Sequence, residues 1–440
     1  MVSIEQLYSI YLRNPVVSTD TRQLPQGCIF FALKGASFDG NLFAAQALEN
    51  GAAYAVIDDP AKQTDERLLL VPDVLTALQK LATHHRMQFE IPVIAIGGSN
   101  GKTTTKELIS SILTSHYPCH FTKGNLNNHI GVPLTLLSMP TNTEVAVIEM
   151  GTNQPCDIEQ LCEIARPTHG LLTNIGKEHL EGFGSLAGVK KAEGELYRYL
   201  ARHSGCVFLN LSEKHLPAMA RRNQRRIEYR QSDILNPNDG TIEVKMLREM
   251  PFVEVAFLSD EGPTVEVRTH LFGRHNFNNV MTAIVLGIYF KVPASKIKSA
   301  LESYRPSNNR SQIVPYGSNT VLLDAYNANP SSMQPALESL QAMPAERKVA
   351  ILGDMLELGA DSKKEHAAML RFAAGLHLDH LVLVGREFAQ TPYKRYHALH
   401  FPDNLAAKTW LEQQKFQNTL ILIKGSRGIR LEKLIEVVEG

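Results

Sequence analysis

Residues 92–108 read PVIAIGGSNGKTTTKEL, and they set the architecture expected for the middle of the chain. Pro92 to Ile96 is a continuous apolar run, which is typical of a strand buried on both faces of a parallel sheet. Gly97-Gly98-Ser99-Asn100-Gly101-Lys102-Thr103-Thr104 follows directly and opens a helix that continues through Leu108. A strand, a glycine-rich turn and a helix in this order predict a phosphate-binding loop.

The residues of this loop suit the binding of phosphate groups. The glycines let backbone N–H groups close around phosphate oxygens, and the helix N-terminus adds favourable partial charge. Lys102 would reach the terminal phosphates and Thr103 would bind Mg²⁺. The strict pattern needs a glycine at position 96, where Ile96 stands, so we expect Gly98 to make the early turn. The alternative is a structural turn with an incidental lysine.

Apolar runs like that of residues 92–96 recur at 145–150, 170–174 and 207–210, with helical patterns between several of them. This alternation predicts a doubly wound parallel sheet. Residues 228–270 differ, because their short stretches alternate between apolar and polar residues. We expect an antiparallel excursion there, before a helix at 278–290 returns to the α/β pattern.

The 440 residues suggest about three domains. A small α/β unit comes first, with helices at 4–12 and 41–50 and strands at 28–33 and 54–58. After a polar break at Tyr304-Arg305-Pro306, apolar runs at 321–324, 349–352, 381–384 and 420–423 alternate with helical segments. This last region predicts a Rossmann-like domain. We therefore predict an α/β protein with domains at 1–90, 91–305 and 306–440.

Composition excludes several classes of partner. The 45 Lys and Arg residues balance the 45 Asp and Glu residues, so no net field attracts nucleic acid or an anionic membrane. No apolar run approaches the roughly 20 residues that span a bilayer. The N-terminus has no basic start followed by an apolar core, so it does not resemble a signal peptide. We expect a cytoplasmic protein.

Glu149 ends the apolar run at 145–150, just before Gly151. Ligands of α/β proteins bind beyond the carboxyl ends of parallel strands. A carboxylate at that edge would face the phosphate loop, so we predict that Glu149 binds Mg²⁺. The alternative is a glutamate at the sheet end that pairs with a lysine.

The ordered set of motifs resembles the Mur ligases, and within them the branch that adds D-alanyl-D-alanine. The resemblance spans nearly the whole chain. The segments that carry it are Gly98–Thr104, Thr122–Asn128 with Ile130–Pro133, Glu149–Gly151, Thr173–Gly176 with His179 and Glu181, Gly273–Asn276 with Asn279, Asp324–Pro330, Leu352–Met355 with Glu357–Gly359, and Lys424–Arg427.

The resemblance implies an ATP- and Mg²⁺-dependent ligase that joins D-alanyl-D-alanine to UDP-N-acetylmuramoyl-tripeptide through an acyl phosphate, acting as a monomer. It implies catalytic roles for Lys102, Glu149 and His179. It assigns adenine to Asn276, and the ribose or phosphates to Arg310 and Asp324. The substrate-binding residues that it implies are Ser18, Asp20 and Arg22 in the first domain, Asn125, Asn127 and Asn128 in the second, and Tyr326, Asn327 and Asn329 in the third.

The resemblance also implies two metal positions. Thr103 and Glu149 would hold one Mg²⁺, and His179 would hold a second together with Glu193. Similar enzymes carry a lysine modified to a carbamate at the place of Glu193, in the segment Lys191-Ala192-Glu193-Gly194-Glu195. We hypothesise that the Glu193 carboxylate replaces this carbamate as a ligand. The alternative is that Glu193 is a solvated helix residue.

Three functional alternatives remain open at this point: another Mur ligase, a ligase like folylpolyglutamate synthetase, and a nucleotide-dependent ATPase that forms no bond. The Asn125–Asn128 and Tyr326–Pro330 segments favour the dipeptide-adding branch. The sequence does not indicate whether the acceptor peptide ends in lysine or diaminopimelate, or which group deprotonates the incoming amine.

Overall fold

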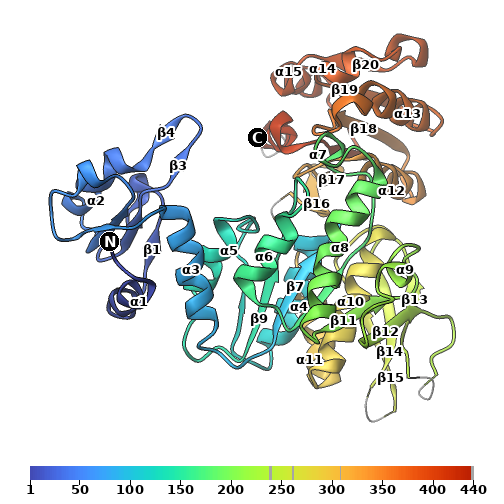
Figure 1. The fold of residues 1–440 in the computed structure, drawn as a ribbon. Coiled ribbons are helices and arrows are strands. Elements are labelled where there is room, and N and C mark those ends of the chain that lie inside the picture. Colours follow the sequence, from blue (N-terminus) through green and yellow to red (C-terminus); the bar gives the residue numbers. More distant parts are fainter. Residues whose placement is uncertain (237–239, 260–261, 308, 438–440) are drawn as a thin grey trace.

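The computed structural model describes residues 1–440 except 237–239, 260–261, 308 and 438–440. Three α/β lobes follow one another along the chain (Figure 1). The first holds a parallel sheet in the order β1 (Val17–Ser18), β2 (Ile29–Phe31), β5 (Tyr54–Ile57) and β6 (Leu68–Leu70). Its other elements are α1 (Ile4–Arg13), α2 (Ala44–Glu49) and the hairpin of β3 (Lys34–Gly35) with β4 (Phe38–Asp39).

Helix α3 (Val74–Arg86) joins the first lobe to the second (Figure 1). It begins at Asp73, whose side chain caps the backbone N–H of Thr76. The helix packs against α1 on one side and against α5 (Gly131–Leu137) and α6 (Asp157–Ala165) on the other. The buried guanidinium of Arg86 donates to the carbonyl oxygen of Ala165 across 3.2 Å. Tyr11 of α1 also donates to the carbonyl oxygen of Leu137 in α5, so α1 and α3 together anchor the first lobe to the second.

The central sheet has nine strands in the order β15-β14-β13-β12-β11-β10-β7-β9-β8. Strand β7 (Val93–Gly97) lies between β10 (His169–Leu172) and β9 (Val145–Glu149), parallel to both. The remaining strands are β8 (Cys119–Phe121), β11 (Cys206–Asn210), β12 (Arg225–Gln231), β13 (Ile242–Arg248), β14 (Glu254–Leu258) and β15 (Thr264–Arg268).

The expected antiparallel excursion at 228–270 is only partly correct. Strand β12 pairs in parallel with β11, and β13 pairs in parallel with β12, so both continue the main sheet. The antiparallel part begins with β14 and β15. Alternation reports one solvated face, which is common in antiparallel sheets, but β12 and β13 show that strands paired in parallel can also have it.

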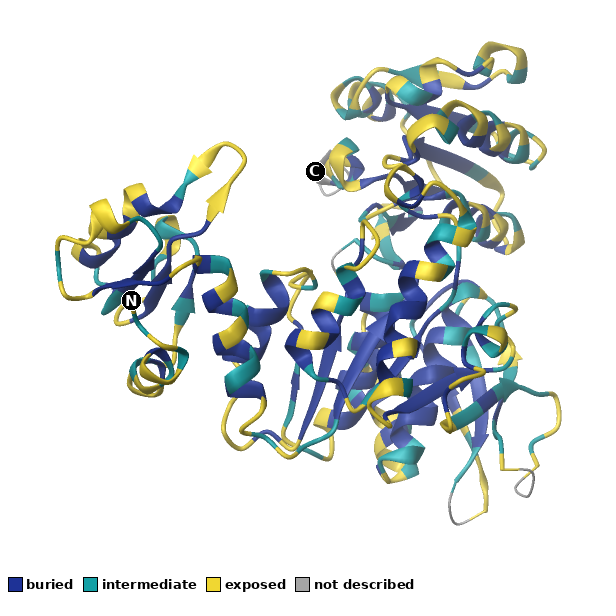
Figure 2. Ribbon diagram, in the orientation of Figure 1, coloured by how far each residue is buried: buried dark blue, intermediate teal, exposed yellow. Residues whose placement is uncertain are grey.

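Helices cover both faces of the central sheet, as the apolar run at 92–96 predicts. Val93 and Ala95 pack in one core, which includes residues of α6 and α8 (Leu186–Arg202). Ile94 and Ile96 pack in the opposite core, against α4 (Lys102–Thr114), α10 (His275–Tyr289) and α11 (Ala294–Ser303). Strands β7 and β9 are buried along their whole length, whereas the outer strand β15 is partly exposed (Figure 2). Short helices α7 (Leu180–Phe183) and α9 (Leu216–Met219) lie at the edges.

The third lobe contains a six-stranded sheet in the order β16-β17-β21-β18-β19-β20. Its strands are parallel except the edge strand β16 (Gln312–Tyr316). The others are β17 (Asn319–Asp324), β18 (Arg347–Gly353), β19 (His380–Val384), β20 (Leu399–Phe401) and β21 (Thr419–Lys424). The helices are α12 (Pro330–Ala342), α13 (Ser362–Ala374), α14 (Arg386–Ala389) and α15 (Asn404–Gln414).

The predicted α/β class with three lobes is confirmed, whereas the precise domain boundaries stay a prediction. Within the described residues, no helix has the length and apolar character needed to cross a bilayer.

Candidate active site

A cavity of about 890 Å³ lies where the carboxyl ends of the central strands meet the third lobe. The phosphate loop forms one wall, and the segment after β17 forms the opposite wall. The cavity brings together most of the residues predicted from the sequence. Those that line it are Ser99, Asn100, Gly101, Lys102, Thr103, Thr104, Asn125, Asn127, Asn128, Glu149, His179, Asn276, Arg310, Asp324, Tyr326, Asn327 and Asn329.

The phosphate loop has the shape that an anion site requires. Gly98 has φ 112° and Gly101 has φ 80°, a backbone region that glycine adopts readily. A Cβ atom on Gly98 would lie 2.3 Å from Thr173 Oγ1, so no larger residue fits. No side chain caps the N-terminus of α4 at Gly101. The first backbone N–H groups of this helix therefore remain available to phosphate oxygens, and the loop fits ATP.

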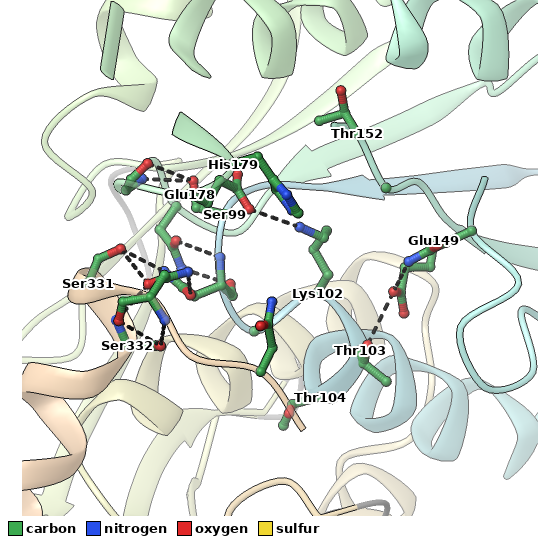
Figure 3. A pocket seen from close by; sticks show the side chains of 18 of the residues that line it. Ser99, Lys102, Thr103, Thr104, Glu149, Thr152, Glu178, His179, Ser331 and Ser332 are labelled. Carbon is green, nitrogen blue, oxygen red and sulfur yellow. Dashed lines mark hydrogen bonds and ion pairs between the residues drawn. The ribbon is translucent and has the colours of Figure 1, made fainter. Parts of the chain in front are cut away.

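Lys102 is the first residue of α4 and is held against the loop (Figure 3). Its Nζ donates to the carbonyl oxygen of Gly98 and lies 3.6 Å from Glu178 Oε2. Burial opposes the positive charge, but Glu178, Glu193 and Glu149 outweigh it and raise the pKa of Lys102. The lysine is therefore charged and ready to pair with an anion.

Thr103 and Glu149 form the predicted pair for Mg²⁺. Thr103 Oγ1 donates to Glu149 Oε1 across 3.1 Å (Figure 3), and Asn127 Nδ2 donates to the same oxygen across 2.8 Å. The other oxygen, Oε2, is buried without a hydrogen-bond partner among the described residues. It lies 3.8 Å from Lys106 Nζ, so the lysine pairing proposed as the alternative is also present.

A hydroxyl next to a carboxylate with an unused oxygen suits Mg²⁺, which keeps several waters and takes its other ligands from phosphates. The described part of the chain contains no group of three or more His, Cys, Asp or Glu side chains that could hold a metal. The geometry therefore fits a cation bound jointly by protein and nucleotide.

His179 reaches the cavity but is paired with the third lobe. Its Nδ1 lies 2.7 Å from Glu357 Oε2, and this hydrogen bond lowers the pKa of Glu357. Two residues earlier, Lys177 Nζ lies 2.6 Å from Glu365 Oε1. These contacts connect the segment after β10 to the third lobe.

Glu193 lies under the phosphate loop and does not line the cavity. Its side chain is 0% exposed, so the alternative of a solvated helix residue is wrong. Its Oε2 accepts a hydrogen bond from the backbone N–H of Gly98 across 2.7 Å. Burial raises the pKa of Glu193 to about 8, although Lys102 opposes this rise. Direct metal binding by Glu193 would require the loop to move.

The predicted adenine residue, Asn276, stands in the first turn of α10 and is buried. Its Nδ2 donates to the carbonyl oxygen of Phe272 across 2.8 Å. Nearby, Asp324 Oδ2 accepts a hydrogen bond from Lys424 Nζ across 2.5 Å. Burial would raise the pKa of Asp324, but Lys424 outweighs it together with other neighbours, so the pKa is lowered. Lys424 also lines the cavity. The predicted nucleoside residues thus sit beside a buried ion pair.

The third lobe touches the phosphate loop directly. Asn329 caps α12, and its Nδ2 donates to Asn100 Oδ1 across 2.9 Å. On the same wall, the guanidinium carbon of Arg310 lies 3.6 Å from the ring centre of Tyr326. Arg427 donates to the hydroxyl of Tyr326 across 3.2 Å. Two cations therefore flank Tyr326.

Ser18, Asp20 and Arg22 do not line this cavity. They lie on the first lobe, beyond α3 (Figure 1), where Arg22 pairs with Asp20 across 2.7 Å. Their predicted contact with substrate stays a prediction.

Sequence reasoning missed Glu178 and did not assign Lys424 to the site. Glu178 precedes His179 in the segment after β10, so the argument from strand ends that selected Glu149 applies to it as well. For Lys424, the signal was its position at the end of the apolar run at 420–423.

Comparisons with known proteins identify the family of this chain. Residues 96–287 match the Mur ligase middle domain, residues 309–427 the Mur ligase glutamate ligase domain, and residues 15–86 the catalytic domain of the Mur ligase family. The UDP-N-acetylmuramoyl-tripeptide–D-alanyl-D-alanine ligase of Bacillus subtilis is 32% identical, over 96% of this chain and 92% of the relative. The Escherichia coli ligase of that name is 35% identical, over 96% and 93%.

Solved structures of similar proteins also match nearly the whole chain. MurF from Acinetobacter baumannii superposes with a TM-score of 0.83 at 30% identity, over 96% of this chain and 93% of that one. MurF ligase from Thermotoga maritima, in complex with ADP, shares the fold with a TM-score of 0.84 at 24% identity, over 97% and 98%. With three family models in order along its length and relatives above 30% identity over almost all of it, the chain belongs to the Mur ligase family.

Proposed function

We propose that this enzyme adds D-alanyl-D-alanine to UDP-N-acetylmuramoyl-tripeptide in peptidoglycan synthesis, using ATP and Mg²⁺ to activate the peptide carboxylate as an acyl phosphate. The relatives named for this reaction match nearly the whole chain. The observation that carries the proposal is the shared cavity. There the phosphate loop and the Thr103–Glu149 pair face the Tyr326–Asn329 segment of the third lobe.

In this proposal the phosphate loop and the metal beside it neutralise the negative charge of the ATP phosphates. A carboxylate is a poor acyl donor, so its oxygen must first accept a phosphoryl group, and this transfer depends on positioning and charge neutralisation. Lys102 would neutralise the terminal phosphates. Mg²⁺, held by Thr103 and Glu149, would supply further positive charge. Asn127 would keep the Glu149 carboxylate in place through its 2.8 Å hydrogen bond.

The third lobe would bring the amine substrate. Arg310 and Arg427 flank Tyr326, so this wall suits a small molecule that carries a carboxylate. Asn327 and Asn329 lie on the same wall. The contact between Asn329 and Asn100 joins this wall to the phosphate loop, so the amine would be held beside the activated carboxyl group.

We assign the uridine nucleotide to the first lobe, residues 1–90, through Ser18, Asp20 and Arg22. The central region, 91–305, would bind ATP with Asn276 at the adenine, and the region 306–440 would complete the site with Arg310 and Asp324. His179 would take part in metal binding once freed from Glu357.

The test measures ATP-dependent phosphate release with UDP-N-acetylmuramoyl-tripeptide, with and without D-alanyl-D-alanine, together with the mass of the product. Release that depends on both substrates and yields a pentapeptide supports the proposal. Release without a pentapeptide would contradict it and would leave an ATPase or a ligase for another amine. Parallel reactions with tripeptides ending in lysine or diaminopimelate would establish acceptor preference.

A further inference from the structure

Glu178 is a buried carboxylate on the wall of the cavity. It stands in the segment after β10 and is 4% exposed. Its Oε2 lies 3.6 Å from Lys102 Nζ, and Figure 3 shows the lysine directed toward it. Its other oxygen, Oε1, is buried and has no hydrogen-bond partner among the described residues. When Glu193 is protonated it shares a hydrogen bond with Glu178, and Lys102 supplies the positive charge beside this buried carboxylate.

Negative charge is concentrated around this lysine. Glu178, Glu193 and Glu149 all act on Lys102, and Glu178 acts on it most strongly. Glu193, which holds the loop from below, is close enough to Glu178 for that carboxylate to help raise the pKa of Glu193. The phosphate loop therefore already has an anion beside its lysine before any nucleotide binds.

A nucleotide phosphate needs the same cation. Lys102 is folded onto the carbonyl oxygen of Gly98 and toward Glu178, so to reach a phosphate it must leave Glu178. The phosphates would then lie near a buried carboxylate that has lost its counter-ion. Like charges brought together in a water-poor site are strongly unfavourable, unless another cation is present.

We propose that Glu178 is the counter-ion that Lys102 exchanges for nucleotide phosphate, and that this carboxylate makes nucleotide binding depend on a divalent cation. The inference rests on the proposed ATP site and adds a positioning residue to it. Glu178 acts through Lys102 and needs no contact with substrate. Arg310 already places one further cation on the cavity wall, and Mg²⁺ on the phosphates supplies the additional positive charge that compensates for the carboxylate that Lys102 releases.

The test is calorimetric titration of the full-length enzyme with ADP, once with Mg²⁺ and once with EDTA. Glu178→Gln keeps the shape and removes the charge, so its Kd for ADP in EDTA should be about tenfold lower than that of the wild type. Mg²⁺ should therefore increase the affinity of Glu178→Gln for ADP by a smaller factor than it increases the affinity of the wild type. Glu178→Asp keeps the charge and should bind ADP weakly in EDTA, as the wild type does.

Glu181→Gln is the matched control, because Glu181 is an exposed carboxylate three residues further along that does not line the cavity. It should bind ADP like the wild type in both buffers. Thermal unfolding of each variant checks that it is folded. An independent measurement uses the wild type alone: in EDTA, ADP should bind no more tightly than adenosine, because its phosphates must displace Glu178.

Three results would overturn the inference while leaving the ATP site standing. The first is equal affinity of Glu178→Gln and wild type for ADP in EDTA. The second is wild-type binding of ADP in EDTA that is much tighter than that of adenosine. The third is weaker binding of ADP by Glu178→Gln in Mg²⁺, which would make Glu178 a metal ligand. Failure of the wild type to bind ADP with Mg²⁺ would overturn the proposed function itself.

Discussion

Glu193 accepts a hydrogen bond from the backbone N–H of Gly98 across 2.7 Å, which connects helix α8 to the phosphate loop from below. The carboxylate is fully buried, and a Cβ atom on Gly97 would lie 2.8 Å from its Oε2. The loop therefore rests on an ionisable group.

Burial raises the pKa of Glu193 from 4.5 to about 8. A carboxyl group whose pKa is higher in the folded state contributes stability below its unfolded pKa, and this contribution is lost as pH rises through the folded value. Glu193→Gln should therefore be more stable than the wild type at pH 8.5. Below pH 4.5 the two should be about equally stable. Thermal midpoints measured across this range check the prediction, and a difference that does not vary with pH would contradict it.

Lys102→Ala should lower kcat by at least about a hundredfold, since it removes the cation expected to stabilise charge on the transferred phosphate. Phosphate release with both substrates measures the effect, and circular dichroism shows whether the fold survives. Lys62→Ala, at an exposed lysine of the first lobe, is the control. Near-normal turnover in Lys102→Ala would refute the assignment of the loop.

Glu149→Gln should raise the Mg²⁺ concentration needed for half-maximal activity by about tenfold or more, because an amide is a much weaker ligand for Mg²⁺ than a carboxylate. The amide can still accept the hydrogen bonds from Thr103 and Asn127, so the fold should persist. Activity is measured over a series of Mg²⁺ concentrations. An unchanged Mg²⁺ dependence would show that the metal binds elsewhere.

Asn329→Ala should raise KM for D-alanyl-D-alanine and reduce stability. It removes both the contact with Asn100 and the cap of α12, and loss of such a cap costs about 1 kcal/mol. Ser332→Ala removes the reciprocal hydrogen bond of the cap and leaves the Asn329–Asn100 contact intact. Steady-state kinetics and thermal unfolding of both variants separate the two roles. An equal rise in KM in both would mean that the cap, and not the contact with the loop, matters.

Much of the fold could be predicted from the sequence because it depends on patterns of residues that are close together along the chain. The apolar run at 92–96, the glycines and the helix after Lys102 are adjacent in sequence, so their order alone predicted β7, the phosphate loop and α4. Strand ends share one edge of a parallel sheet, which led to Glu149 beside Thr103. The three-lobed α/β architecture followed from the same alternation of strands and helices, and the motif order led to the Mur ligase family.

Only the tertiary structure decided what surrounds Lys102. Strand direction at β12 and β13 depends on pairing partners, which alternation does not encode, so the antiparallel prediction there was partly wrong. Glu193 and Gly98 are 95 residues apart, and their contact arises because α8 packs under β7. Glu178 and Glu193 look like ordinary surface carboxylates in the sequence, but both are buried, and burial raises the pKa of Glu193. Solvent exclusion depends on the assembly of distant segments, and no local pattern of residues reports it.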